Sequence, residues 1–253
     1  DVLERFVEDL GTTGQISFES VGSEETQESL QKLIRVARNL GQKYDVVVTN
    51  PPYMGASGMG AKLSKYVKDN YPDSKSDLFA VFIEKCGLMA KKNGYQAMIT
   101  QHAWMFLSSF EKLRNKLQMM DIVNMAHLGP RAFEEIGGEV VQTTSFVLRR
   151  SYIEKYKGTY SRLIEPTTQQ GKEKMFLNVE NRYFSEQDNF SKIPGCPVAY
   201  WINTQYYKLF ETTTSLINNM DICQGMKTAD NDRFLRKWYE ISKRKMGYKW
   251  FPY

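Results

Sequence analysis

The stretch YDVVVTNPPYMG, residues 44–55, decides the fold. After Tyr44 and Asp45 comes the β-branched run Val46–Thr49, which is typical of a buried strand. The run stops at Asn50, two prolines and the aromatic ring of Tyr53. A proline fixes its own φ and biases the residue before it toward extended geometry, so these four residues are expected to form a stiff hook at the strand's end.

The segments after the hook alternate between helical and strand patterns. Apolar residues recur at helical spacing from Asp77 to Lys91, with Ser76 or Asp77 as the expected cap and Gly94 just past the helix. The pattern predicts further elements: a strand at 95–100, a helix at 107–117, and strands at 122–128 and 140–149. This alternation indicates an α/β fold with a mostly parallel sheet, in which ligands bind beyond the carboxyl ends of the strands.

The regions on either side of residues 44–150 have other patterns. Residues 1–43 read as a helix, a short strand near 16–18 and a second helix over 25–40. The Gly-rich stretch 54–76 reads as a mobile loop. From Ser151 the chain becomes irregular and rich in Tyr, Thr and Asn, so a domain boundary is expected near 150–160, with a second domain over 151–253.

Composition and length limit the classes of protein. The chain has 253 residues, 42% of them hydrophobic and 25% charged, as in ordinary soluble globular proteins. No apolar run approaches the ~18 residues of a membrane span. Three widely spaced cysteines indicate a reducing compartment and exclude a cysteine-based zinc site. His102 and His127 stand alone in the sequence, so both are expected to be structural and no metal site is expected.

The net charge of +5 lies in one C-terminal stretch, Lys227–Lys249. It holds eight basic residues against three acidic ones, whereas the rest of the chain has 26 of each sign. Its basic residues are Lys227, Arg233, Arg236, Lys237, Lys243, Arg244, Lys245 and Lys249. Aromatic residues are interleaved with them, which suits a nucleic-acid surface and equally a solvated helix face with aromatic anchors.

The hook itself carries acceptors and few donors. The side-chain oxygen of Asn50 and the carbonyl of Pro51 can converge on an NH2 group, and Tyr53 offers a flat ring beside them. An exocyclic amine is a poor nucleophile because its lone pair is delocalised. Two acceptors that hold its hydrogens favour a pyramidal nitrogen and so stabilise the transition state of attack. The alternative is an ordinary strand-ending turn.

The segment VVVTNPPYMG resembles the fourth motif of the amino-methyltransferases that use S-adenosylmethionine (SAM). Residues 75–106 are similar to the next helix–strand unit of the gamma-class adenine-N6 DNA methyltransferases, and residues 128–150 to the segment with the second base-stacking aromatic. Residues 225–241 resemble the target-recognition domain of restriction–modification and BREX-type phage-defence methyltransferases. The resemblance implies the C-terminal half of a SAM-dependent methyltransferase sheet, followed by the start of a target-recognition domain.

The resemblance also implies roles for individual residues. In this family the target adenine is flipped out of double-stranded DNA. The implied catalytic residues are Asn50, Pro51, Pro52 and Tyr53. Tyr53 would stack on one face of the adenine and Phe133 on the other, while Phe82 and Asn50 would contact SAM. The basic residues from Lys227 to Lys245 would contact DNA. The implied setting is the cytoplasm of a bacterium or archaeon.

One departure from the family pattern concerns the cofactor. The family has a Gly-rich SAM loop and an acidic ribose ligand before the hook, and no G-x-G precedes Asn50 here. We therefore expect this chain alone to be inactive, and its exposed strand edge to be covered by residues 1–43 or to cause self-association. Two alternatives stay open: a methyltransferase for protein glutamine or ribosomal guanine, and a non-catalytic DNA-binding fragment.

Overall fold

The computed structural model describes residues 21–133, 141–221 and 234–247. The chain divides into two compact units, residues 1–211 and 212–253. The strand expected near 16–18 lies outside the described residues, as do Lys227, Arg233 and Lys249 of the basic stretch.

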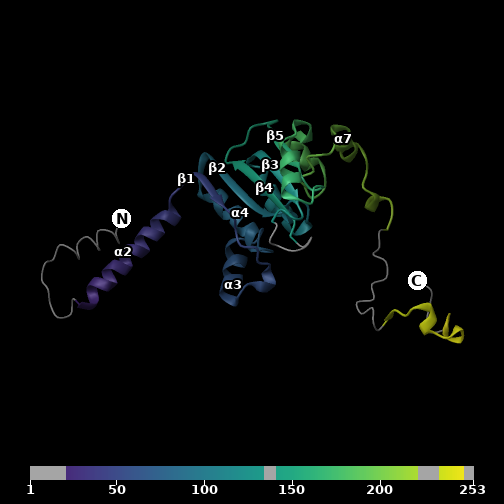
Figure 1. Cartoon of the computed structure of the whole chain (residues 1–253), viewed down its shortest axis with the longest axis horizontal. Helices are drawn as coiled ribbons and strands as arrows, with labels where there is room; N and C mark the ends of the chain where they lie inside the picture. Colours follow the sequence, from purple (N-terminus) through teal and green to yellow (C-terminus); the bar gives the residue numbers. More distant parts are fainter. Residues whose placement is uncertain (1–20, 134–140, 222–233, 248–253) are drawn as a thin grey trace. The chain divides into compact units, whose positions relative to one another are not determined.

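A six-stranded sheet organises the first unit (Figure 1). Its strands are β1 (Tyr44–Thr49), β2 (Ala90–Gln101), β3 (Asp121–Gly129), β4 (Thr143–Arg149), β5 (Lys157–Arg162) and β6 (Arg182–Glu186). They lie in the order β1-β2-β4-β3-β5-β6. β1 is parallel to β2 and β3 to β5, while β4 runs antiparallel between β2 and β3. β1, β2, β3 and β5 therefore point the same way, and their carboxyl ends share one edge of the sheet, the carboxyl edge.

The helices connect and cover these strands. The α-helices are α2 (Val21–Gly41), α3 (Ala61–Asn70), α4 (Leu78–Met89), α5 (Glu111–Leu117), α6 (Gln169–Leu177) and α7 (Thr204–Thr212). The 3-10 turns are η2 (Ala56–Gly58), η3 (His102–Met105), η4 (Ser108–Phe110), η5 (Val179–Asn181), η6 (Gln187–Lys192), η7 (Leu216–Asn218), η8 (Trp238–Glu240) and η9 (Lys243–Lys245). Helix α4 packs against β1 and β2.

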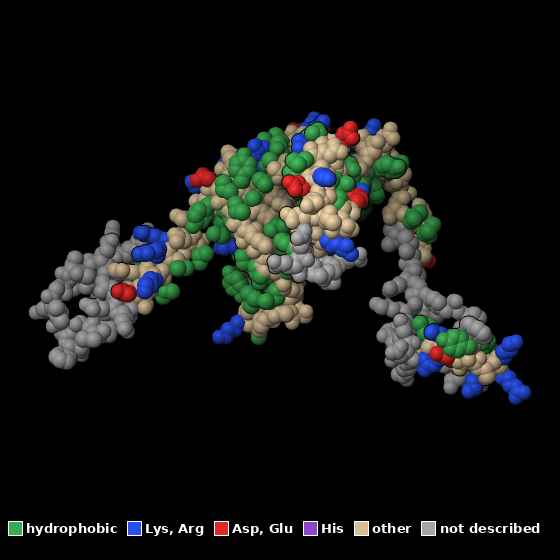
Figure 2. Space-filling model, in the orientation of Figure 1, with side chains coloured by type: hydrophobic (Ala, Val, Ile, Leu, Met, Phe, Trp, Pro, Cys, Tyr) green, Lys and Arg blue, Asp and Glu red, His purple; other side chains and the backbone are tan. Residues whose placement is uncertain are grey.

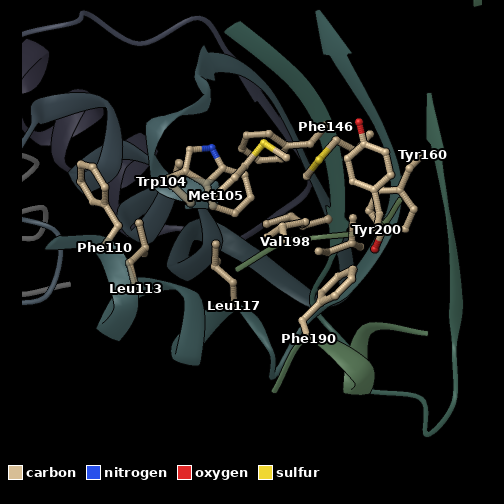
Figure 3. Packing of buried hydrophobic residues seen from close by; sticks show 14 of the residues in the cluster. Trp104, Met105, Phe110, Leu113, Leu117, Phe146, Tyr160, Phe190, Val198 and Tyr200 are labelled. Atoms are coloured by element: carbon tan, nitrogen blue, oxygen red, sulfur yellow. The ribbon is translucent and has the colours of Figure 1, made fainter. Parts of the chain in front are cut away.

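The core lies on one face of the sheet. Met98 of β2 and Met125 of β3 both pair with Phe146 of β4, so one row of apolar side chains runs across three strands. Helices α4 and α5 and the segment 187–200 cover this row (Figure 3). Trp104 is fully buried among them, and its indole N–H donates to the Thr100 hydroxyl over 3.1 Å. This arrangement confirms the α/β class, but the sheet is mixed instead of mostly parallel, because β4 and β6 run antiparallel to their neighbours.

β1 differs from its expectation as a buried strand. It pairs with β2 alone and forms one border of the sheet. Val47 packs against the core, but Val46 and Val48 are 54% and 70% exposed because they face the opposite side. Residues 21–43 add no strand to this border, and the rest of the expected cover, residues 1–20, lies outside the described residues. The helix in this region is longer than expected and reaches Val21.

Two other expectations were wrong. The Gly-rich stretch contains helix α3 instead of a continuous loop, because Val67 and Tyr71 bury against Met59 and Val81. Gly94 lies inside β2 at a register shift, where a Cβ would lie 2.9 Å from a backbone oxygen of β1. The sheet continues through β5 and β6, and the domain boundary expected near 150–160 stays a prediction. The identity of residues 151–253 as a target-recognition domain stays a prediction.

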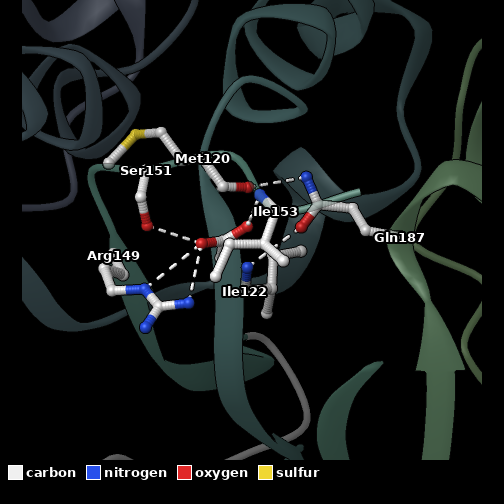
Figure 4. Close-up of polar contacts among 7 residues, drawn as sticks. Met120, Ile122, Arg149, Ser151, Ile153 and Gln187 are labelled. Carbon is white, nitrogen blue, oxygen red and sulfur yellow. Dashed lines mark hydrogen bonds and ion pairs between the residues drawn. The ribbon is translucent and has the colours of Figure 1, made fainter. Parts of the chain in front are cut away.

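A buried carboxylate holds the end of the sheet opposite the carboxyl edge (Figure 4). Asp121 is 2% exposed and accepts hydrogen bonds from the Arg149 guanidinium at 2.9 Å, the Ser151 hydroxyl at 2.5 Å and the Ile153 N–H at 2.8 Å. Burial of a charge is costly unless it is paired and hydrogen-bonded. Asp121 therefore fixes the turn after β4 to the start of β3.

We expect Asp121→Ala to lower the free energy of unfolding by about 3–5 kcal/mol, because Arg149 loses its buried partner. The matched control is Asp188→Ala, since Asp188 accepts from the exposed Tyr152 hydroxyl and Lys155 N–H and should cost less than about 1 kcal/mol. Urea unfolding followed by circular dichroism measures both. Equal destabilisation by the two variants would contradict a special role for Asp121.

Candidate active site

The hook follows β1 at the carboxyl edge of the sheet. Asn50 is exposed, and its side chain makes no hydrogen bond within the part of the chain that the structure describes. Pro51 is buried and Tyr53 is half-buried. An amide on a rigid backbone with free donors and acceptors can bind a polar ligand group without first breaking an internal hydrogen bond.

The carboxylate of Asp77 fixes the hook to helix α4. It caps the helix by accepting from the Phe79 N–H at 3.3 Å, and the same oxygen accepts from the Met54 N–H at 3.1 Å. The Leu78 N–H donates back to the Met54 carbonyl over 2.9 Å. Asp77 was expected as a cap, but its second bond was not, because that bond crosses 23 residues of sequence. The residues after Tyr53 are therefore held at the start of α4.

The ring of Tyr53 has a defined position. It packs edge-on against Phe79, with ring centroids 6.1 Å apart and planes at 83°. Its hydroxyl lies 3.5 Å from the Ile99 carbonyl of β2, the outer limit of a hydrogen bond. Burial raises the pKa of the Tyr53 phenol, so the hydroxyl stays protonated at neutral pH. The ring is thus a neutral, fixed surface beside Asn50.

Phe133 follows β3, on the same edge of the sheet as the hook. β3 ends at Gly129, whose φ of +66° favours glycine, and a Cβ there would lie 2.7 Å from the Ile164 side chain. Phe133 is half-buried four residues further on, and residues 134–140 lie outside the described ranges. The convergence of Asn50, Tyr53 and Phe133 on one cleft stays a prediction.

Phe82 lies on α4 and packs, half-buried, against the main core. A half-buried ring on the helix beside β1 fits either a core residue or the wall of a cofactor site. The only G-x-G of the chain, Gly58-Met59-Gly60, lies at the junction of η2 and α3, with Met59 buried against α3. The described residues before the hook supply no glycine loop at a strand end.

The expectation that His102 and His127 are isolated was wrong. Nδ1 of His102 lies 2.8 Å from Nε2 of His127, and Nδ1 of His127 lies 3.2 Å from the Tyr200 hydroxyl. His102 directly follows β2, and His127 lies in β3, two residues before its end. Because β4 separates these two strands, the pair forms only in the folded sheet. Phe106 packs against both rings at centroid distances of 5.6 and 5.8 Å.

Burial sets the protonation of this pair. It lowers the pKa of His127 to about 4, with further lowering by His102, Arg162 and Lys172, and it lowers the pKa of His102 as well. Both rings are therefore neutral at pH 7, one donating and the other accepting the hydrogen bond between them. A neutral pair suits a structural or hydrogen-bonding role better than electrostatic attraction of an anion.

The second unit carries the described part of the basic stretch. Arg236, Lys237 and the η9 residues Lys243, Arg244 and Lys245 are exposed, and Figure 2 shows blue side chains projecting from this unit. The Lys237 ammonium lies 5.7 Å from the centroid of the Tyr239 ring. Exposure of the cations fits contact with DNA phosphates, which stays a prediction.

Within residues 21–133, 141–221 and 234–247, no three His, Cys, Asp or Glu side chains gather as a metal site. None of the helices described there combines the length and apolar character needed to cross a membrane.

A family model and two similar proteins all place this chain among the restriction-modification and adenine-specific methyltransferases. The family model of the Eco57I restriction-modification methylases matches residues 3–132. The adenine-specific methyltransferase PglX of Lacticaseibacillus casei (strain Zhang) is 44% identical over 95% of this chain, and BrxX of Escherichia coli O9:H4 (strain HS) is 38% identical over 92%. The chain spans 22% and 20% of these two relatives, about a fifth of their length.

The fold is similar to a solved chain of a type I restriction–modification system. The likeness has a TM-score of 0.50 at 16% identity and covers 72% of this chain and 42% of the other. At that identity it supports the fold alone, and it agrees with the methyltransferase fold class expected from the sequence.

The His102–His127 pair predicts a pH dependence of stability. The folded pKa of His127 lies below its unfolded value, so the unfolded chain binds more protons as pH falls from about 6.5 to 4. The stability contributed by neutral His127 is present above pH 6.5 and is lost over this window, by about 3 kcal/mol. Urea unfolding at several pH values measures it. His127→Gln should flatten this window, and an unchanged pH profile in that variant would contradict the assignment.

Proposed function

We propose that this chain forms the amine-binding part of an adenine-N6 DNA methyltransferase, because it belongs to the Eco57I restriction-modification methylase family. The observation that carries this proposal is the hook. An exposed Asn50 amide and the Pro51 carbonyl stand at the carboxyl end of a parallel strand, and Asp77 fixes the backbone that follows. The substrate is an adenine flipped out of duplex DNA.

Asn50 and Pro51 act on the amine of the adenine. The Asn50 side-chain oxygen and the Pro51 carbonyl each accept one hydrogen of the N6 group. This favours a pyramidal nitrogen whose lone pair is free to attack, and the proton leaves after the new bond forms. Pro51 and Pro52 have no N–H, so neither proline supplies a backbone donor that competes for these acceptors.

Tyr53 and Phe133 hold the base. Tyr53 stacks on one face of the adenine, and its contact with Phe79 keeps the ring from rotating away. Phe133 contacts the other face from the turn after β3. SAM supplies the methyl group when bound, and Asn50 and Phe82 are the described residues that would contact it. In-line transfer requires the amine and methyl donor at near-contact distance, which a rigid hook favours.

We expect Asn50→Ala in the complete protein to slow methyl transfer by on the order of 10²-fold with little loss of DNA affinity, because the lost acceptor acts mainly in the transition state. Single-turnover transfer of labelled methyl groups from SAM to plasmid DNA measures the rate. The control is Asn70→Ala, since Asn70 ends α3 and bonds only the Tyr66 carbonyl among the described residues. An unchanged rate in Asn50→Ala would overturn the proposal.

The basic second unit contributes to DNA affinity through phosphates. Replacing Lys243, Arg244 and Lys245 of η9 with Gln should reduce the slope of log affinity against log salt by about 2–3 units, because fewer counterions are released. The control variant replaces Lys155, Lys157 and Lys192, which lie beside the carboxylates of Glu154, Glu186 and Glu211. Fluorescence anisotropy with labelled duplex DNA measures both. Equal slopes in wild type and the η9 variant would show that this stretch is an ordinary solvated surface without phosphate contacts.

A further inference from the structure

Lys172 on helix α6 is a buried cation that the proposed function does not use. The residue is 6% exposed, and its ammonium donates to the Leu128 carbonyl at 2.6 Å and to the Leu163 carbonyl at 2.7 Å. Burial lowers the pKa of this ammonium, and the nearby Glu165 offsets only part of that lowering. Because burial of an ammonium is costly unless it is hydrogen-bonded, the two carbonyls fix where this group lies.

The two carbonyls belong to neighbouring parallel strands, at the point where their pairing ends. β3 and β5 pair as far as His127 and Arg162, and the Leu163 N–H then donates to the His127 carbonyl over 2.8 Å. Leu128 is the residue before the end of β3, and Leu163 directly follows β5. The Lys172 ammonium therefore joins the carboxyl ends of both strands beyond their backbone pairing.

A second contact holds the same end of β3. At Gly129, the last residue of the strand, an added Cβ would lie 2.7 Å from the Ile164 side chain and 3.0 Å from its Cα. The backbone of Gly129 therefore packs directly against Ile164, the residue after Leu163. We call these two contacts the clamp: the Lys172 bonds to two carbonyls, and the packing of Ile164 on Gly129.

Helix α6, which carries Lys172, is itself fixed to the sheet. Thr168 caps the helix by accepting from the Gly171 N–H at 3.1 Å, and the Lys172 N–H donates to the Thr168 carbonyl over 3.0 Å. In the turn η5 after the helix, the Asn181 amide donates to the Arg162 carbonyl at the end of β5 over 2.8 Å. These bonds at the start of α6 and after it make Lys172 a fixed support for the end of β3.

The turn that the clamp holds carries Phe133, four residues after Gly129. β1 and β3 are three strand positions apart, which is about 14 Å at ~4.8 Å per strand. Four residues of extended chain span at most about 14 Å. Because the two lengths are comparable, the position of Gly129 directly determines whether Phe133 reaches a base at the hook.

We infer that Lys172 is a positioning residue for the flipped adenine, because it holds the end of β3 where Phe133 contacts the face of the base opposite Tyr53. The inference rests on the proposed function, which supplies the base and the role of Phe133. Lys172 is buried and both of its bonds go to backbone carbonyls, so it acts through the turn after β3 and not by touching the base.

A purely structural role is the alternative, in which Lys172 stabilises the sheet without affecting the base. The two roles differ in their coupling to Phe133. Positioning acts through Phe133, so loss of the Lys172 bonds has no further effect once that ring is removed. Under a structural role, the effects of the two substitutions on the methylation rate multiply independently.

The test uses the complete protein carrying Lys172→Met, which keeps most of the side-chain length and removes the donors. The matched control is Lys174→Met, the same change at an exposed position of the same helix. Sequencing of plasmid DNA treated with the wild-type protein first maps the methylated adenines. Single-turnover methylation and permanganate oxidation of the thymine opposite the target adenine are then measured on a duplex with the mapped site.

Lys172→Met should slow single-turnover methylation by about tenfold, because Phe133 no longer holds the base in the reactive position. Permanganate reactivity should fall by at least about half, since fewer target bases are flipped out. Duplex affinity, measured by fluorescence anisotropy, should stay within about threefold of wild type, because phosphate contacts dominate it. Lys174→Met should match the wild type in all three measurements.

A double-mutant cycle with Phe133→Ala decides between positioning and structure. In that background, adding Lys172→Met should change the methylation rate by less than about twofold. A further tenfold loss there overturns the inference, as does a wild-type rate in Phe133→Ala or in folded Lys172→Met, or equal losses in Lys172→Met and Lys174→Met. These results leave the role of Asn50 intact. A wild-type protein that methylates no adenine overturns the proposed function as well.

Circular dichroism reports whether each variant folds. If Lys172→Met does not fold, Ile164→Ala takes its place, since it removes the other contact of the clamp and leaves the Lys172 bonds. Ile164→Ala should slow methylation by about threefold, and this loss should be absent when Phe133→Ala is also present. A wild-type rate in Ile164→Ala, or the same loss in both backgrounds, then overturns the inference.

Discussion

The shared direction of β1, β2, β3 and β5 is the constraint on which the rest of the site depends. Because β4 inserts antiparallel between β2 and β3, strands that are not neighbours in the sheet still end at the same edge. The hook and the histidine pair both stand at those ends. If neighbouring strands alternated in direction throughout the sheet, these groups would be divided between its two opposite ends.

Rigidity of the hook has two separate sources. Two prolines restrict the backbone locally, and the Asp77 carboxylate then ties the next residue, Met54, to the start of α4. The Asn50 side chain is left without an internal partner in the described structure, so its hydrogen-bonding capacity is available to a ligand. This combination is what electrostatic preorganisation requires, because little reorganisation is needed at the moment of reaction.

Local features of the sequence predicted local structure well. The hook, the Asp77 cap of α4 and the α/β alternation follow from proline geometry, capping and periodicity, and the structure has each of them. Predictions were wrong where a contact joins distant segments. His102 and His127 were expected to be isolated, yet they meet at 2.8 Å because β4 brings β2 and β3 within reach. Val48 was expected to be buried, but strand order leaves it at the sheet's border.

By itself, therefore, the sequence determined the hook at Asn50–Tyr53, the family resemblance and the concentration of net charge between Lys227 and Lys249, because each is encoded by consecutive residues. The tertiary structure alone decided which arginines of the sheet have a buried carboxylate partner. Arg149 and Arg162 are both arginines near strand ends. One is neutralised by buried Asp121, and the other stands beside Trp201 with Glu165 3.7 Å away. Charge pairing depends on distances across strands, and no local pattern of residues records those distances.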